Sequence, residues 1–146
     1  MESCDVLIIG GGPAGSSCAS ELRRHGLDVA VMDKATFPRN KVCAGWITPS
    51  VVETLRLDTE DYARQHVLQP ITAFRTGLID GPELETRYPA TVSYGIRRSE
   101  FDNYLLQRSG ARLMQGRAME SIERRGDGWL VNGAITTPVV VGAGGH

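Results

Sequence analysis

A short apolar run that leads directly into closely spaced glycines constrains this chain more than any other feature. Residues 5–15 read Asp-Val-Leu-Ile-Ile-Gly-Gly-Gly-Pro-Ala-Gly, and the glycines at positions 10, 12 and 15 have the spacing G-x-G-x-x-G. The uncharged residues Val6 to Ile9 are typical of a central parallel strand that is buried on both faces. We expect this strand to turn sharply into a helix whose N-terminus receives the pyrophosphate of a dinucleotide.

Each of the three glycines at positions 10, 12 and 15 has a separate expected task. Gly10 permits the sharp turn, Gly12 lets backbone N–H groups approach the phosphates, and Gly15 lets the helix and the strand pack closely. Pro13 suits the first helical turn, where a missing N–H costs little, and Ala14 follows it. We therefore predict that these five residues bind the cofactor.

An acidic residue closes the next predicted strand at the position that a ribose ligand requires. The helix is expected to end at His25-Gly26, and a strand at 28–32 then ends on Asp33. Asp33 follows Gly15 by 18 residues, close to the ~20-residue spacing at which a carboxylate accepts the hydrogen bonds of an adenosine ribose. We predict that role for Asp33; the alternative is an exposed acid at the end of a strand.

Composition excludes several classes of protein. At 146 residues the chain is long enough for about one domain with a real core. Its net charge is −1 and it has no long basic run, so we expect no nucleic-acid partner. Its three cysteines have no metal-ligand spacing and are odd in number, which favours a reducing compartment without disulfides or a metal site. The apolar runs are too short for a signal peptide or a membrane span, so we expect a cytoplasmic protein.

The rest of the chain alternates between helical and strand patterns. We predict a hairpin around Asp80-Gly81-Pro82, with one wet face because Leu84, Thr86 and Tyr88 alternate with charged residues. Further elements are predicted as a loop at 34–45, a helix at 48–55 with Thr48 as its N-cap, and strands at 111–114, 118–124, 129–132 and 139–142.

A second helix is predicted to begin with a capping box formed by Ser99 and Asp102 and to end at Gly110. Its inward residues are expected to be Phe101, Tyr104 and Leu105. The whole pattern indicates an α/β, doubly wound, Rossmann-like domain that is interrupted by a β-hairpin and a small β-meander.

Four stretches of the sequence together resemble a known family. They are Gly10-Gly-Gly-Pro-Ala-Gly15 with Asp33-Lys34, Phe37-Pro-Arg-Asn-Lys-Val-Cys-Ala-Gly45, Arg98-Ser-Glu-Phe-Asp102, and Val141-Gly-Ala-Gly-Gly145. The chain resembles the N-terminal part of the flavoprotein family that contains geranylgeranyl reductases, flavin-dependent halogenases and aromatic hydroxylases. This resemblance covers nearly the whole sequence.

The resemblance implies that the cofactor is FAD and adds further cofactor-binding residues: Lys34, Cys43, Ala44, Gly45, Arg98, Ala118, Gly142 and Ala143. Cys43 lies either against the isoalloxazine or under its loop as a small hydrophobe. Arg98 either pairs with the phosphate or ribityl region of FAD or is a solvated arginine at a helix start. The backbone of Ala118 is expected to clamp the adenine.

Two positions depart from the family pattern, and one family motif is missing. Gly144 stands where the family usually has Asp, and Ala44 stands where reductases often have Gly. The sequence ends before the family's Gly-Asp-Ala motif, so we expect residues 1–146 to be the N-terminal portion of a larger FAD-binding fold. Within it, residues 67–96 are expected to belong to an inserted substrate-side segment.

The sequence shows no acid, base or nucleophile in a catalytic arrangement, so catalytic residues stay unknown. This agrees with a flavin enzyme, in which the cofactor carries the redox chemistry. The resemblance, and the Cys43 loop in particular, favours a FAD-dependent oxidoreductase of the geranylgeranyl reductase type, which transfers hydride through flavin N5 to an isoprenoid or similar apolar substrate. The alternatives are a monooxygenase or halogenase acting on an aromatic substrate, and a non-catalytic FAD- or ADP-binding module. An NAD-dependent dehydrogenase fits Pro13, the hairpin and the Arg98 motif poorly.

Partners follow from the same interpretation. We expect FAD, an apolar or aromatic substrate, and NAD(P)H or another electron donor. Exposed apolar surface would favour self-association or contact with a missing C-terminal half. A prenyl lipid substrate would place the protein at the periphery of a membrane.

Overall fold

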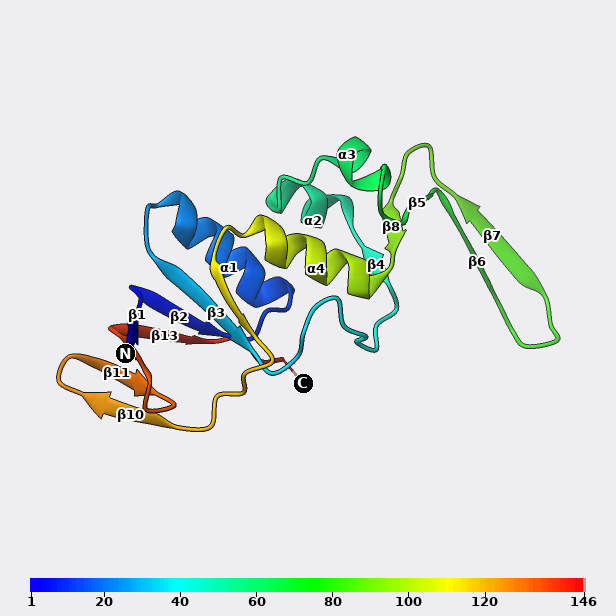
Figure 1. Ribbon diagram of the computed structural model, residues 1–146. Coiled ribbons are helices and arrows are strands. Elements are labelled where there is room, and N and C mark those ends of the chain that lie inside the picture. Colours follow the sequence, from blue (N-terminus) through cyan, green and yellow to red (C-terminus); the bar gives the residue numbers. More distant parts are fainter. Residues whose placement is uncertain (146) are drawn as a thin grey trace. The chain divides into compact units, whose positions relative to one another are not determined.

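The computed structural model describes residues 1–145, which divide into two compact units (Figure 1). Unit 1 comprises Met1–Asn40 and the chain from Asp102 onward, and unit 2 comprises Lys41–Phe101. In the described part of the chain, no helix is long and apolar enough to cross a membrane.

Unit 1 is built on a four-stranded parallel sheet. Its strand order is β13 (Val139–Gly142), β2 (Val6–Ile9), β3 (Val29–Asp33) and β9 (Arg112–Gln115). The strand that begins the glycine motif is therefore central, with β13 on one side and β3 on the other. This arrangement confirms the predicted α/β, Rossmann-like class.

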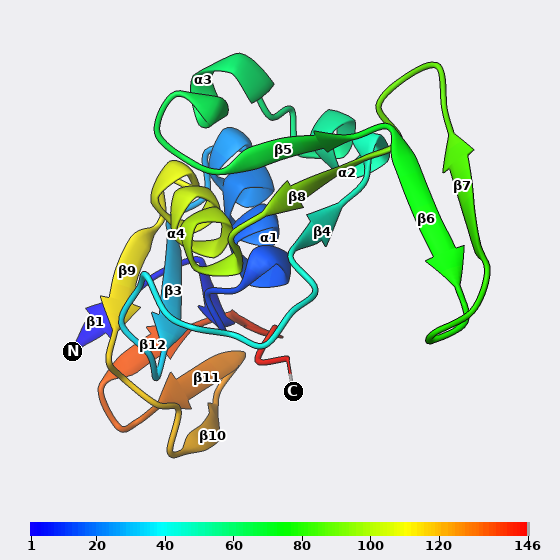
Figure 2. The same ribbon diagram turned by 90° about the vertical axis from the view of Figure 1, so that its right-hand side faces the viewer.

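Both faces of this sheet are covered. Since successive strand residues point to opposite faces, Ile8 and Val31 pack with Ala19 of helix α1 (Pro13–Arg24). Their neighbours Leu7 and Met32 pack on the other face, with residues of a β-meander. Figures 1 and 2 show α1 along one face of the sheet and the meander along the other. Burial on both faces explains why these strands have continuous apolar sequences.

The sheet that contains the meander has two strands more than predicted, β1 (Glu2–Ser3) and β12 (Ile135–Thr137). Its order is β1, β12, β11 (Gly128–Val131) and β10 (Ile122–Arg125). The strand expected from residue 118 begins only at Ile122.

The late start of β10 has a local cause. The side chain of Asn132 accepts hydrogen bonds from the N–H groups of Glu120 (2.8 Å) and Ser121 (3.1 Å), and it donates one to the Ala118 carbonyl (2.8 Å). A side-chain amide thus takes the place of a partner strand for these residues.

Unit 2 contains a three-stranded antiparallel sheet, two short helices and a separate hairpin. The sheet order is β4 (Trp46–Ile47), β8 (Ser93–Ile96) and β5 (Leu68–Ile71). The helices are α2 (Pro49–Thr54) and α3 (Thr59–Ala63), and the hairpin joins β6 (Ala73–Gly77) to β7 (Glu83–Arg87). Helix α4 (Arg98–Arg108) begins in unit 2 and continues in unit 1.

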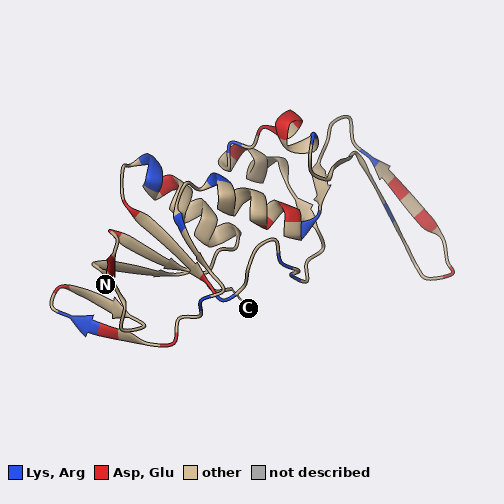
Figure 3. Ribbon diagram, in the orientation of Figure 1, with Lys and Arg blue, Asp and Glu red and all other residues tan. Residues whose placement is uncertain are grey.

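The hairpin forms where predicted, but the expectation of one dry face was wrong. Every residue of β7 is exposed, including Leu84. The charges along β7 are visible in Figure 3, and Arg75 on β6 pairs with Glu83 (3.5 Å) and Glu85 (3.2 Å) across the ribbon. Alternation therefore marks the two faces of a ribbon, and both faces are exposed along β7.

One of the two predicted helix caps is confirmed. Thr48 is the N-cap residue of α2 and Pro49 follows it, although the Thr48 hydroxyl contacts the Ser50 hydroxyl (2.8 Å) and no backbone N–H of the helix. Helix α4 already begins at Arg98, so Ser99 and Asp102 lie inside it and form no capping box. Asp102 is fully buried and pairs with Arg39, which explains why its side chain does not turn back to the helix start.

The inward face of α4 was predicted in part. Phe101 and Leu105 are buried as expected, whereas Tyr104 is only half-buried. Leu106, which was not predicted, is buried in the core of unit 1 beside α1 and the sheet.

Candidate functional site

The turn from β2 into α1 admits only glycine at two of its predicted positions. Gly10 has φ +111°, and a Cβ there would lie 2.3 Å from the Ala143 carbonyl oxygen. A Cβ on Gly15 would lie 1.8 Å from the Gly10 carbonyl oxygen. The end of β13 is tied to the same turn, because the Ala143 N–H donates to the Ile9 carbonyl (2.7 Å). Of the predicted residues at this strand end, Ala143 thus lies directly against Gly10, and Gly142 pairs with Ile9.

The N-terminus of α1 is open to an anion. Gly12 is the N-cap with extended backbone, Pro13 follows at N1, and no side chain caps the helix. The first turn also contains no acidic residue. Since the first N–H groups of a helix have no partner within it, those of residues such as Ala14 and Gly15 are suited to a phosphate.

Asp33 lies at the C-terminal end of β3, and backbone groups fix its carboxylate. One oxygen accepts from the Gly11 N–H (2.7 Å) and the other from the Ala35 N–H (2.8 Å). Each carboxylate oxygen has a second lone pair, so both retain capacity for a ribose hydroxyl. The predicted ribose contact therefore fits this geometry and stays a prediction.

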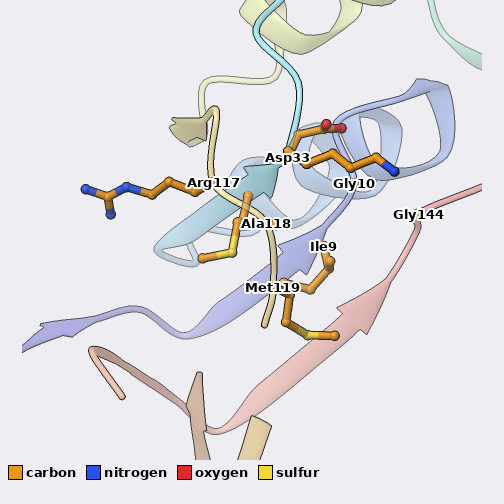
Figure 4. A pocket seen from close by; sticks show the side chains of 9 residues that line it. Ile9, Gly10, Asp33, Arg117, Ala118, Met119 and Gly144 are labelled. Atoms are coloured by element: carbon orange, nitrogen blue, oxygen red, sulfur yellow. The ribbon is translucent and has the colours of Figure 1, made fainter. Parts of the chain in front are cut away.

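A pocket of about 220 Å³ opens at this edge of the unit 1 sheet (Figure 4). Parallel α/β sheets bind ligands at the carboxyl ends of their strands. Figure 4 shows Gly10 and Asp33 next to each other, with Arg117 extending away from Asp33. The lining residues are Ile9, Gly10, Met32, Asp33, Lys34, Arg117, Ala118, Met119 and Gly144.

This pocket brings together four predicted residues, Gly10, Asp33, Lys34 and Ala118. Ala118 is held there because the Arg117 N–H donates to the Asp33 carbonyl (2.9 Å) and Asn132 binds the Ala118 carbonyl. The backbone around Ala118 is therefore fixed by contacts from two directions.

Sequence reasoning missed the other residues of this pocket. Ile9 and Met32 were seen only as core residues, although their places at the ends of neighbouring parallel strands mark them as pocket residues. Arg117 and Met119 flank Ala118, so their adjacency to a predicted residue was an available signal. Gly144 was noted only as a departure from the family pattern.

In unit 2, the predicted residues Cys43, Gly45 and Arg98 lie together, with Ala44 between the first two. Gly45 has φ +68°, and its carbonyl accepts the Ile96 N–H (2.7 Å). The Gly45 N–H donates to the Cys43 sulfur (3.4 Å), and the Arg98 side chain also hydrogen-bonds this sulfur. These two contacts, the Gly45 N–H first, lower the pKa of the exposed Cys43 thiol.

The other two cysteines differ from Cys43. Burial raises the pKa of the Cys4 thiol, which belongs to the core between the sheet and the meander. Cys18 is half-buried on α1 and packs against the core on the opposite face. Both positions agree with packing roles.

Comparisons with known proteins agree on one family. The sequence model of the family described as "FAD binding domain" matches residues 3–131. The menaquinone reductase of Mycobacterium tuberculosis (strain ATCC 25618 / H37Rv) is 35% identical over 122 residues, which cover 79% of this chain and 29% of that protein. A flavin-dependent halogenase of Acremonium egyptiacum is 32% identical over 133 residues, covering 84% of this chain and 24% of the halogenase. The chain thus spans less than a third of these curated relatives.

Solved structures show the same fold. A geranylgeranyl bacteriochlorophyll reductase-like protein from Thermoplasma acidophilum superposes with a TM-score of 0.80 at 19% identity, over 99% of this chain and 40% of that one. The flavin-dependent brominase Bmp2 superposes with a TM-score of 0.74 at 26% identity, over 99% of this chain and 38% of the brominase.

Proposed function

This chain belongs to the FAD binding domain family, and we propose that it is the cofactor-binding portion of a reductase that transfers hydride to an isoprenoid or similar apolar substrate. Its cofactor is FAD, which when bound supplies the hydride chemistry through its flavin ring. The observation that carries the reductase proposal is the 35% identity with menaquinone reductase over 122 residues. Menaquinone is an isoprenoid quinone, and the proposed substrate class includes it.

The residues of unit 1 fit the dinucleotide half of FAD. In this proposal, the pyrophosphate binds at the N-terminus of α1, where Gly12 offers no Cβ and the first-turn N–H groups are available. Asp33 accepts the hydrogen bonds of the adenosine ribose. The adenine occupies the pocket against the backbone of Ala118, with Lys34 beside it.

The loop of unit 2 supplies the contacts to the flavin in this proposal. The Cys43 thiol is exposed, and its contacts with the Gly45 N–H and the Arg98 side chain hold it in place. We assign these residues to orienting the ring and to no acid, base or nucleophilic step. Residues 67–96 are assigned to the substrate side.

An anaerobic reoxidation experiment tests the reductase proposal. FAD-loaded protein is reduced chemically, then mixed with menaquinone in detergent, and the return of the oxidised flavin spectrum is timed. We expect faster reoxidation than for free reduced FAD under the same conditions. Equal rates with the protein-bound and free flavin would overturn the proposal. A parallel reduction with NADH or NADPH identifies the donor.

The halogenase relatives provide a second candidate function. The 32% identity with the Acremonium halogenase supports an oxygen-dependent reaction on an aromatic substrate. In that case, reduced protein-bound flavin should react with oxygen in the presence of halide and an added phenol and yield the halogenated phenol, whereas menaquinone without oxygen should leave the flavin reduced. Product analysis by mass spectrometry separates the two functions.

A further inference from the structure

Arg39 is held in an unusual place in unit 1. Its side chain is only 20% exposed, and its guanidinium carbon lies 4.7 Å from the centre of the Phe37 ring. Its Nη1 atom lies 3.5 Å from Oδ2 of Asp102, whose side chain is fully buried. A buried carboxylate requires a cation beside it because desolvation strongly penalises an uncompensated charge. Asp102 and Phe37 therefore fix the position of this guanidinium.

The other end of the guanidinium reaches the start of α1. Nη2 of Arg39 lies 3.5 Å from the position that a Cβ on Gly12 would occupy. Gly12 is the N-cap, and neither a side-chain cap nor a first-turn acid is present to meet the arginine there. A guanidinium beside the positive end of a helix dipole is unfavourable unless an anion joins the two.

One nitrogen of this guanidinium also lacks a hydrogen bond. Nη1 is buried and makes none of good geometry with any residue in the described part of the chain, although it takes part in the ion pair with Asp102. Buried polar atoms in native proteins nearly always have a hydrogen-bond partner. The unsatisfied Nη1 atom faces Oδ2 of Asp102, which also lacks a hydrogen bond of good geometry among the described residues, whereas Nη2 is the nitrogen next to the proposed phosphate position.

We propose that Arg39 is a ligand of the FAD pyrophosphate and that Asp102 is the positioning residue that aims it. A guanidinium can donate two parallel hydrogen bonds to phosphate oxygens, which suits a diphosphate better than a point charge does. The inference rests on the proposed placement of the pyrophosphate at α1. It gives a joint role to Arg39, which had no assigned task, and to Asp102, whose predicted capping box does not form.

The test is a titration of the apoprotein with FAD at low and at high salt, with flavin fluorescence as the measure of binding. Arg39→Met should weaken FAD binding at least tenfold and make the affinity less sensitive to salt, because one phosphate contact is lost. Arg39→Lys should fall between the wild type and Arg39→Met. The matched control is Arg64→Met, which removes an arginine whose side chain is 74% exposed and should leave the affinity unchanged.

ADP separates a contact to the phosphates from a contact to the flavin. It carries the same two phosphates, so Arg39→Met should weaken ADP and FAD by similar factors. Asp102→Asn should weaken FAD binding in the wild type but add little to Arg39→Met, because a positioning residue acts through the arginine. If Asp102→Asn fails to fold, as circular dichroism would show, the Arg39 variants still decide.

Gly12→Ala distinguishes failure of this inference from failure of the proposed pyrophosphate site. A Cβ at Gly12 meets only Arg39, at an ordinary contact distance of 3.5 Å, so the fold should survive while phosphate approach is hindered. Weaker FAD binding in Gly12→Ala with unchanged binding in Arg39→Met would overturn the role of Arg39 alone. Unchanged binding in both variants would overturn the pyrophosphate site as well.

Discussion

The carboxylate of Asp33 organises the backbone around it as well as facing the pocket. It joins the glycine turn to the segment after β3 through the N–H groups of Gly11 (2.7 Å) and Ala35 (2.8 Å). The residue is thus expected to fix the shape of the site before the cofactor binds. Its replacement should affect both the apoprotein and FAD affinity.

We expect Asp33→Ala to weaken FAD binding by roughly 1–3 kcal/mol, the cost of losing a charged hydrogen bond. Asp33→Asn keeps one acceptor oxygen, so its FAD affinity should fall less than that of Asp33→Ala. FAD titration measures the loss, and thermal unfolding of the apoproteins shows how much of it comes from the turn. Wild-type affinity in a folded Asp33→Ala protein would reject the ribose contact.

Cys43 should be the most reactive thiol of this chain. Because the Gly45 N–H and Arg98 lower its pKa, its thiolate persists to lower pH than that of an ordinary cysteine. Alkylation by iodoacetamide, followed by mass spectrometry across a pH series, should modify Cys43 first and the buried Cys4 last. Arg98→Met should move the Cys43 profile to higher pH.

Arg97→Met is the matched control for this experiment. The Arg97 side chain is 68% exposed and pairs with Glu100 (3.3 Å). Its loss should leave the profile unchanged. An identical shift in the Arg97 and Arg98 variants would contradict the specific contact between Arg98 and the thiol.

At the scale of elements, the β2–α1 turn determines whether the site exists. We expect Gly10→Ala to destabilise the protein by at least about 1–3 kcal/mol from backbone strain, because φ is +111° and the Cβ would meet the Ala143 carbonyl. Gly144→Ala is the control, since a Cβ there has nothing within 4 Å. Urea unfolding compares the two, and equal stability would contradict the account of the turn.

Elements with local determinants were predictable from the sequence. β2, α1 and β3 were identified because apolar pattern, Pro13 and the glycines all indicate the same local structure. The capping box failed because the partner of Asp102 is Arg39, far away along the chain. The same reason applies to the pocket: Arg117 and Met119 become lining residues only when the segment after β9 is tied to Asp33.

At the scale of the whole molecule, each unit contains its own group of predicted cofactor-binding residues. Unit 1 contains the pocket and the helix N-terminus, while unit 2 contains Cys43, Gly45 and Arg98. Sequence resemblance assigned both groups to one cofactor, and that assignment stays a prediction. Hydrogen exchange can test it.

We expect bound FAD to slow amide exchange in the glycine turn of unit 1 and in the Cys43–Gly45 loop of unit 2. Ligand contact and exclusion of water reduce local opening. The exposed β6–β7 hairpin should be unaffected and serves as the internal reference. Protection confined to unit 1 would contradict contact between the unit 2 loop and the flavin.

Titration of the purified apoprotein with FAD, read by the visible spectrum and by thermal unfolding, tests the central claim most directly. We predict a yellow complex with one FAD per chain and an unfolding temperature that rises with FAD concentration, as linkage requires, whereas NAD has no such effect. A colourless protein that is stabilised by NAD and not by FAD would contradict the account.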